Sequence, residues 1–447
     1  MSSSPLESLA AWAAGLRAGD LPSSVAERLE VVLASVLGVT AVGAADRGAL
    51  VEAWDPPPGP SVLIGTGRST TPDAAAWLNA TALVSLELDE GNRFAGGHPA
   101  AHGWPAVLAL AGARDADGPT TAAALVVAYE VAARFGRATR LRPGTHPHGT
   151  WGATGAAAGC ARLMGLPPAA MAAAVDAAAG MAIAGPFTAA LDGNPVRDEW
   201  VGAANQSGLA AARLAAARFA EVPSAAGRPS AGGWPLGMAR HSLGGLLGTF
   251  DEAALSERLG ERWDLELGYF KRHASCAYTH PTADAVLELR PHLALDDIDR
   301  VDVETYTAAA SLDRIECPTR LAAMFSVPFV VATALREGAV RPDAFTRIDA
   351  ARPLMNRVHL AVDPDIDARV PEHRGARVRI RLRSGETVEA AVDDPIGDAA
   401  RGPFGRSDVE ALLADLLGSA ADAERVCAVA QELPWMGSVR RALQELP

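Results

Sequence analysis

Over the first 265 residues, apolar positions recur every three or four residues, between short breaks of glycine, proline and serine. This spacing is typical of helices that bury one face. Alanine is abundant in these segments, so neighbouring helices can pack closely. The pattern predicts a large all-helical domain, with two helices between residues 6 and 45 and further helices over 72–88, 105–113, 120–137, 150–164, 168–184 and 202–219.

Two of the predicted helix starts carry cap signals. Ser24-Val-Ala-Glu27 has the spacing of a capping box, and Thr71 followed by Pro72 fits an N-cap and a first helical position. Residues 61–65 form a short apolar segment that is compatible with a strand or with a buried connector. Residues 222–236 are rich in Gly, Pro and Ser, which predicts a loop.

The pattern changes in the last third of the chain. Residues 299–305 alternate between apolar and polar positions, as a strand does. Apolar residues alternate with arginines over 377–383. A Ser-Gly turn and a second strand-like segment at 387–392 follow, which predicts a hairpin with one apolar face and one arginine face. Residues 319–337 have a helical pattern again, so we expect a smaller α+β domain here.

These patterns divide the chain into three stretches. Residues 1–268 form the first part of the helical domain, 269–400 the α+β lid domain, and 401–447 a return to helix. Because chain termini often lie close together, we expect the last stretch to rejoin the first domain. A chain of 447 residues is long enough for two domains, each with its own core.

Charge and composition exclude several classes of function. The formal net charge is −13 and basic residues form no cluster, which argues against binding to nucleic acid or to an anionic membrane. The N-terminus lacks the features of a signal peptide, and no apolar run reaches membrane-spanning length without a charge, so we expect a cytoplasmic protein. The four cysteines are scattered without a C-x-x-C pair, which signals neither disulfides nor a zinc or iron–sulfur site.

The segment 86–105 concentrates chemistry in a loop rich in glycine. Glycine lets the backbone approach a ligand closely, and loops carry chemistry because a rigid scaffold can aim their side chains. Within twenty residues this segment gathers three carboxylates, an arginine and two histidines, which are Glu87, Asp89, Glu90, Arg93, His98 and His102. Such a mixture indicates an acid/base site.

Three more short segments carry similar residues. Residues 142–151 contain two histidines before a helix start, where an anionic ligand is favoured, and residues 194–202 contain a charged cluster around Arg197. Residues 268–281 hold a lysine, an arginine and two histidines. A single loop histidine is more often structural, but six of ten histidines in three short loops favour one shared site.

A metal site is the weaker interpretation of these histidines. His98 and His102 have the i, i+4 spacing of a helical ligand pair, but Pro99 and Gly103 argue against a regular helix across them. We therefore expect no metal at this place.

Five segments, taken in order, resemble the MmgE/PrpD family, which includes 2-methylcitrate dehydratases, cis-aconitate decarboxylases and an iminodisuccinate epimerase. Leu86-Glu-Leu-Asp-Glu90 followed by His98-Pro99 is similar to the family's "LDFDDT…HP" loop, and 145–158 to "GFHPT…GAAAA". Residues 161–166 resemble "ARLLGL", 271–280 resemble "KPYPCC…H", and 394–398 resemble "PKGDP". The resemblance covers nearly the whole chain.

This resemblance implies a large helical domain with a smaller α+β lid, a homodimer, no cofactor and an active site between the domains. It places six residues on family active-site positions, with Arg197 at a further one: Glu87, Asp89, His98, His146, Lys271 and His280. This sequence departs from the family motifs at three residues, and these differences bear on the expected substrate more than on the expected fold. The family's first aspartate is Glu87 here, its loop threonine is Gly91, and a lysine before the helix at 202 is Arg197.

These residues suggest a mechanism for a lyase that removes a proton next to a carboxylate. We expect Arg197 and Arg272 to clamp substrate carboxylates, with Arg93 and His280 as further substrate ligands. Lys271, with its pKa lowered by burial near arginine, is expected to move the carbon-bound proton. We expect His98 or His146 to act as the partner acid, with its imidazole ring oriented by Asp89. Glu87 is a further candidate catalytic residue of this site.

The expected reaction is dehydration of a hydroxy-di- or tricarboxylate such as 2-methylcitrate, because this is the family's commonest activity. Decarboxylation or epimerisation of a related acid, such as cis-aconitate or iminodisuccinate, is the alternative, since it needs no leaving hydroxyl. A non-catalytic protein that binds an acidic metabolite is a third possibility, motivated by Glu87, Gly91 and Arg197.

Overall fold

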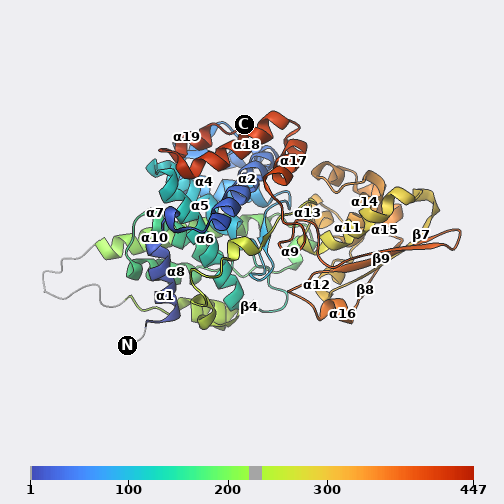
Figure 1. The fold of residues 1–447 in the computed structure, drawn as a ribbon, viewed down its shortest axis with the longest axis horizontal. Coiled ribbons are helices and arrows are strands. Elements are labelled where there is room, and N and C mark those ends of the chain that lie inside the picture. The colour runs from blue at the N-terminus through green and yellow to red at the C-terminus, as the bar shows by residue number, and fades with distance from the viewer. Residues whose placement is uncertain (1–2, 221–233) are drawn as a thin grey trace.

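The computed structural model describes residues 3–220 and 234–447. Figure 1 shows a large helical body beside a smaller α+β body. This arrangement is the mainly α fold with a smaller α+β domain that the sequence predicts. Most of the predicted loop at 222–236 lies outside the described residues.

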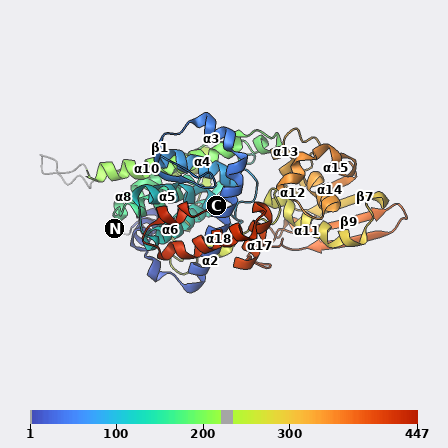
Figure 2. The ribbon, with the colours of Figure 1, turned by 90° about the horizontal axis from the view of Figure 1, so that it is seen from above.

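The helical body is built from the N-terminal half of the chain and from the C-terminal helices. Its N-terminal helices are α1 (Pro5–Gly15), α2 (Ser23–Asp46), α3 (Gly48–Trp54), α4 (Pro72–Val84), α5 (Pro99–Arg114), α6 (Gly118–Ala138), α7 (Ala153–Leu163), α8 (Pro168–Ala179), α9 (Thr188–Leu191) and α10 (Val196–Ala220). The C-terminal helices are α17 (Arg406–Leu417), α18 (Ala420–Glu432) and α19 (Val439–Gln444). Figure 2 shows α17 and α18 lying across this body, where both pack against α2.

Small two-stranded sheets interrupt the helical pattern. Strand β1 (Pro58–Leu63) pairs with β2 (Arg68–Thr70), so the apolar segment at 61–65 belongs largely to a strand. Strand β4 (Thr139–Leu141) pairs with β5 (Gly248–Phe250). The helical domain therefore carries short strands beside its helices.

The α+β body contains one four-stranded sheet, in the order β10-β9-β7-β8. The strands are β7 (Ile298–Thr305), β8 (Val358–Val362), β9 (Ala376–Leu382) and β10 (Thr387–Val392). The helices are α11 (His280–Leu289), α12 (Thr307–Ala310), α13 (Arg320–Met324), α14 (Val327–Glu337), α15 (Ile348–Met355) and α16 (Pro364–Asp367). The predicted hairpin is confirmed as β9–β10, with Val378 and Ile380 buried and the arginines between them on the other face.

Two predictions about helix ends differ from the structure. The capping box at Ser24 is wrong, because α2 begins at Ser23 after Pro22 and its N-cap makes no side-chain hydrogen bond. A capping box instead opens α1, where Ser4 and Glu7 exchange hydrogen bonds. The N-cap of α4 is confirmed, since the Thr71 hydroxyl accepts a hydrogen bond from the Ala74 N–H.

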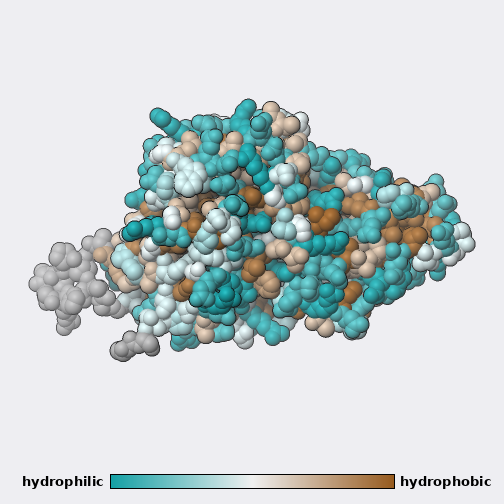
Figure 3. Space-filling model, in the orientation of Figure 1, coloured by the Kyte–Doolittle hydropathy of each residue, from teal (hydrophilic) through white to brown (hydrophobic). Residues whose placement is uncertain are grey.

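Helix α2 is the one described helix with the length and apolar composition of a membrane span. It lies in the core, packed against α4, α17 and α18, and 72% of its most apolar window is buried. Figure 3 shows a largely hydrophilic face with small hydrophobic patches, one of them over the junction of the two bodies.

Candidate active site

A short pair of strands ties the two bodies together at the candidate site. Strand β3 (Gly91–Asn92), in the loop between α4 and α5, pairs with β6 (Gly268–Tyr269), with Gly91 opposite Tyr269. The chain beyond β6 then joins the α+β body, because the Cys276 N–H donates to the Met324 carbonyl over 2.9 Å. This pairing brings segments 86–98 and 268–281 together.

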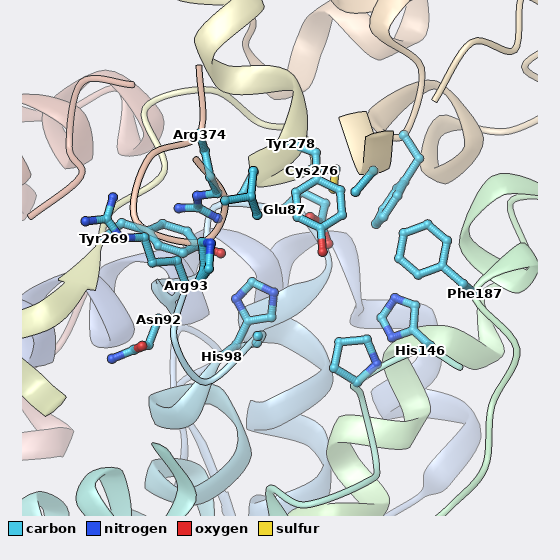
Figure 4. Close-up of a pocket in the computed structure, with 18 of the residues that line it drawn as sticks. Glu87, Asn92, Arg93, His98, His146, Phe187, Tyr269, Cys276, Tyr278 and Arg374 are labelled. Carbon is cyan, nitrogen blue, oxygen red and sulfur yellow. The ribbon is translucent and has the colours of Figure 1, made fainter. Parts of the chain in front are cut away.

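Beside this strand pair lies a cavity of about 130 Å³ (Figure 4). From the helical body it is lined by Glu87, Asn92, Arg93, His98, His146, Phe187 and Arg197. From β6 and the α+β body it is lined by Tyr269, Cys276, Tyr278, Tyr306, Phe325 and Arg374. The cavity therefore lies between the bodies, and its size suits a small metabolite.

His98 is the residue of the 86–98 loop that is best placed for proton transfer. Its Nδ1 atom lies 2.9 Å from Asp89 Oδ2 and 2.6 Å from the Glu90 carbonyl oxygen. Both neighbours accept hydrogen bonds, so Nδ1 carries a proton and Nε2 is the nitrogen left for a ligand. Burial opposes a charge on Asp89, but His98 and Lys271 outweigh it and hold the pKa of this carboxyl well below its usual range.

The helix at His98 also differs from the sequence expectation. Helix α5 runs from Pro99 to Arg114 through His102, with His98 as its N-cap. The argument against a regular helix is wrong here, because proline is favoured at the first helical position. The His102 Nδ1 atom lies 2.7 Å from the His98 carbonyl oxygen. In the described part of the chain, no cluster of three His, Cys, Asp or Glu residues has the geometry of a metal site.

Lys271 lies behind the cavity, enclosed by protein. Its Nζ atom donates to Glu87 Oε2 over 2.8 Å and to Asp89 Oδ1 over 3.0 Å. Burial disfavours the charged ammonium, but the two carboxylates outweigh this effect and raise the pKa of Lys271 above its ordinary value. The prediction of a lowered pKa is therefore wrong, and Lys271 is a fixed cation that holds Glu87 and Asp89.

Arg197 completes this buried group of charges from the first turn of α10. It pairs with Glu87 and, through Nη1 and Oδ1 at 2.8 Å, with Asp198, which also pairs with Arg47. Glu87 has a φ of 53°, which is uncommon for a residue other than glycine. Such strain is found at functional sites, where surrounding contacts enforce it.

His146 approaches the cavity from the loop before α7. Its ring stacks on Phe187 at 5.3 Å, and the His148 N–H donates to its Nδ1 atom over 3.1 Å. Nδ1 is therefore an acceptor, which leaves the proton on Nε2 in the neutral ring. Burial, and then the charge of Arg197, lower the pKa of His146 well below its ordinary value, so this ring is neutral at pH 7.

Two further arginines lie at the end of the cavity near Tyr269. Arg93 Nη1 contacts Asp394 Oδ1 at 3.1 Å and Asp398 Oδ1 at 2.9 Å, whereas Arg374 Nη2 contacts Asp398 Oδ2 at 3.2 Å. The two aspartates come from the late segment 394–398 that resembles "PKGDP". Arg93 thus lines the cavity as expected and links the bodies.

The sequence did not single out several residues of the cavity wall. Tyr269, Tyr278 and Cys276 lie within the segment 268–281, in which the lysine, the arginine and the two histidines were the candidates for chemistry. Tyr306 and Arg374 lie in segments without a recognised signal. The Tyr306 hydroxyl is buried and has no hydrogen-bond partner among the described residues, so it is available to a ligand.

The structure places two expected substrate ligands outside the cavity. Arg272 is turned the other way, with a side chain 46% exposed and 3.7 Å from Asp284, in a second cavity of about 390 Å³ against α17. Successive residues of an extended segment point to opposite sides, and Lys271 takes the inner side. His280 lies at the start of α11, where its Nε2 is 3.2 Å from the Ser275 carbonyl oxygen.

Comparisons with known proteins agree with this architecture. A family model for the MmgE/PrpD N-terminal domain matches residues 7–235, and one for the MmgE/PrpD C-terminal domain matches residues 273–433. Cis-aconitate decarboxylase of Aspergillus terreus is 26% identical over 93% of this chain and 89% of its own. Cis-aconitate decarboxylase-like protein oryM of Aspergillus oryzae is also 26% identical, over 93% of this chain and 91% of its own. The chain belongs to the MmgE/PrpD family.

Proposed function

We propose that this protein is a lyase that acts on a small di- or tricarboxylate and transfers a proton at a carbon atom next to a carboxylate. The observation that carries this proposal is the pair of imidazoles at the cavity. His98 keeps its proton on Nδ1 and presents Nε2, whereas His146 keeps its proton on Nε2. One ring can exchange a proton while the other donates a hydrogen bond to a substrate oxygen.

Asp89 and the arginines support this transfer. When His98 holds a proton on both nitrogens, the ionised Asp89 carboxylate at 2.9 Å stabilises the imidazolium. Arg197 and Arg374 line the same cavity and supply positive charge for substrate carboxylates and for the enolate that forms in the reaction. Lys271 acts only through the carboxylates that it holds, because its raised pKa keeps it protonated.

Within this class we propose decarboxylation ahead of dehydration. His98 first takes a proton from solvent on Nε2 and becomes an imidazolium. The C–C bond to one carboxylate then breaks, its electron pair passes into the adjacent unsaturated carboxylate, carbon dioxide leaves, and the imidazolium gives its Nε2 proton to carbon, which returns His98 to the neutral form. Dehydration also needs an acid for the leaving hydroxide, and a neutral His146 is a poor one. The names of the two fungal relatives support the same choice.

Turnover in D₂O tests this proposal. The protein is incubated with cis-aconitate, citrate, 2-methylcitrate and iminodisuccinate, and each mixture is followed by NMR. We expect loss of carbon dioxide from the unsaturated tricarboxylate, with one deuteron bound to carbon in the product. Loss of water from citrate or 2-methylcitrate would favour dehydration, and absence of turnover on all four acids would contradict the proposal.

Substitution of His98 tests the assigned proton carrier. His98→Asn is expected to lower kcat about 10²- to 10⁴-fold, the usual contribution of a general acid or base. His359→Asn, at an exposed position of β8, is the matched control and should leave kcat unchanged. Full turnover by the His98 variant would remove this residue from the mechanism.

A further inference from the structure

Gly91 and Tyr269 form a matched pair at one wall of the cavity. The two residues face each other in the β3–β6 pairing. A Cβ atom on Gly91 would overlap the hydroxyl oxygen and Cζ of Tyr269. Gly91 is not among the glycines with a left-handed φ, so the backbone does not require glycine. Glycine is needed at position 91 because the Tyr269 side chain fills the space that a Cβ atom would occupy.

The hydroxyl end of the ring, rather than its edge, lies over Gly91. Tyr269 is 7% exposed and lines the cavity, and the Arg374 guanidinium lies over its ring at 4.5 Å from the centroid. Asp398 fixes Arg374 from the other side, at 3.2 Å. A phenylalanine ring would fill this space equally well, so packing alone does not explain the hydroxyl, which interacts with Arg374.

Burial raises the pKa of Tyr269 above its ordinary value, so the phenol stays neutral and can donate a hydrogen bond. Arg374, with its Nε atom buried and unpartnered among the described residues, can donate beside it. In Figure 4, Tyr269, Arg93 and Arg374 lie together at one end of the cavity. This end of the cavity therefore presents several donors and a positive charge.

We propose that Tyr269 is a specificity-determining residue, whose hydroxyl donates to a substrate carboxylate that Arg374 also binds, while its ring closes this end of the cavity. The proposal rests on the proposed function, because it assumes a polycarboxylate ligand. Gly91 contributes by leaving room for the ring.

The first test removes only the hydroxyl. Tyr269→Phe keeps the ring over Gly91 and should keep the melting temperature of the wild type. Binding of tricarballylate, a saturated tricarboxylate without an alkene or hydroxyl, is measured by calorimetry. A lost hydrogen bond to a charged group corresponds to roughly a 10- to 150-fold weaker Kd. We expect a loss in this range, together with a similar rise in KM for the true substrate.

The outcomes separate this inference from the proposed function. If wild-type protein binds tricarballylate and Tyr269→Phe binds it equally well, the inference is overturned and the lyase proposal stands. If the wild type binds no di- or tricarboxylate and turns over none, the proposed function fails and the inference fails with it.

A swap of the pair gives a second, independent test. Gly91→Ser alone should weaken tricarballylate binding, because its Cβ atom overlaps the ring. Tyr269→Ala removes the ring, and the double variant Gly91→Ser with Tyr269→Ala returns a hydroxyl from the neighbouring strand. We expect the double variant to bind more tightly than Tyr269→Ala. Gly15→Ser, where an added Cβ meets nothing within 4 Å, is the control for serine in place of glycine, and equal binding by the double variant and Tyr269→Ala would contradict the pairing.

Discussion

Lys271 is the single lysine of the chain, and the structure gives it a role that its residue type did not reveal. It lies between Glu87 and Asp89, so the two carboxylates and the two cations Lys271 and Arg197 balance in charge. The sequence assigns all four residues to one candidate site, and the structure brings them into contact. The sequence could not give their protonation states, because a pKa depends on burial and on neighbours that only the folded chain brings together.

The single lysine permits a direct measurement. In protein labelled with ¹⁵N-lysine, the one Nζ resonance should show a protonated ammonium up to at least pH 10, because Glu87 and Asp89 raise its pKa. A titration of this signal between pH 6 and 9 would restore Lys271 as a candidate base.

Removal of this cation should be costly. Lys271→Met leaves two buried carboxylates with one cation fewer, and breaking a buried pair costs about 3–5 kcal/mol. We expect a loss of this size in the free energy of unfolding in urea. Lys271→Arg keeps the positive charge and should lose less, so equal losses in both variants would argue that packing rather than charge is responsible.

Glu90 offers a prediction about pH. Burial raises its pKa to about 8, against hydrogen bonds from the Ala100 N–H and the Tyr129 hydroxyl. The folded state therefore binds this proton more tightly than the unfolded state. The contribution of this proton to the free energy of unfolding is complete below the unfolded pKa of about 4.3. It is lost as the pH rises to the folded pKa of about 8. Glu130, whose pKa burial also raises to about 8, adds a second contribution.

Glu90→Gln removes one of these titrations. Its free energy of unfolding should fall less steeply than that of the wild type between pH 5 and 9, where one such group contributes up to about 1.4 kcal/mol per pH unit. Glu432→Gln, at an exposed position of α18, should keep the wild-type slope. Parallel curves for the Glu90 variant and the wild type would show that Glu90 is ionised in the folded protein.

The helices were predictable because their period is local, and several of their ends were not. The Thr71-Pro72 signal gave the start of α4, since cap and helix lie within a few residues of each other. The sequence pattern predicts a helix only from residue 105, whereas α5 begins at Pro99, because proline and glycine disfavour a helix interior but proline suits a first helical position. These two helices frame the loop from Glu87 to His98, so their ends fix the site.

The crossing of α2 and α4 is a second constraint on that loop. A Cβ atom on Gly43 of α2 would overlap the Ala82 carbonyl of α4, two residues before that helix ends. Gly43→Ala should therefore destabilise the protein by roughly 1–3 kcal/mol, as overpacking does, and lower turnover through a displaced loop.

Gly15→Ala, with open space around the new methyl group, should raise stability by roughly 0.4–1 kcal/mol. Thermal unfolding and kcat of both variants give the comparison.

The whole molecule is organised around the junction of its two bodies, and Arg93 forms one of the ion pairs that span this junction. Arg93→Gln leaves the buried Asp394 and Asp398 without this partner, so we expect faster hydrogen exchange in 91–98 and 394–398 and a higher KM. Arg381→Gln breaks an exposed pair with Asp299 inside the sheet and should change neither, because exposed pairs contribute little. Unchanged exchange in the Arg93 variant would show that other contacts hold the bodies together.

The C-terminal helices α17 and α18 pack against α2 of the helical body. Figure 1 shows α1 and α19 at opposite ends of that body, so this packing does not follow from neighbouring termini. It follows from burial, since α17 and α18 cover the apolar α2. The homodimer implied by the family and the cytoplasmic location stay predictions, and light scattering of the purified protein would test the first.

By itself, the sequence determined the fold class and the family, and it singled out four segments as candidates for the chemistry, because apolar periodicity and short motifs are properties of neighbouring residues. The tertiary structure decided which side chains face the ligand. Arg374 and Tyr306 arrive at the cavity from distant segments, whereas Arg272 turns away from it. It also decided that Lys271 is a fixed cation and that His98 presents Nε2. The first result depends on a contact between residues 184 positions apart, which no local pattern encodes. The second depends on how the loop before α5 folds back on His98.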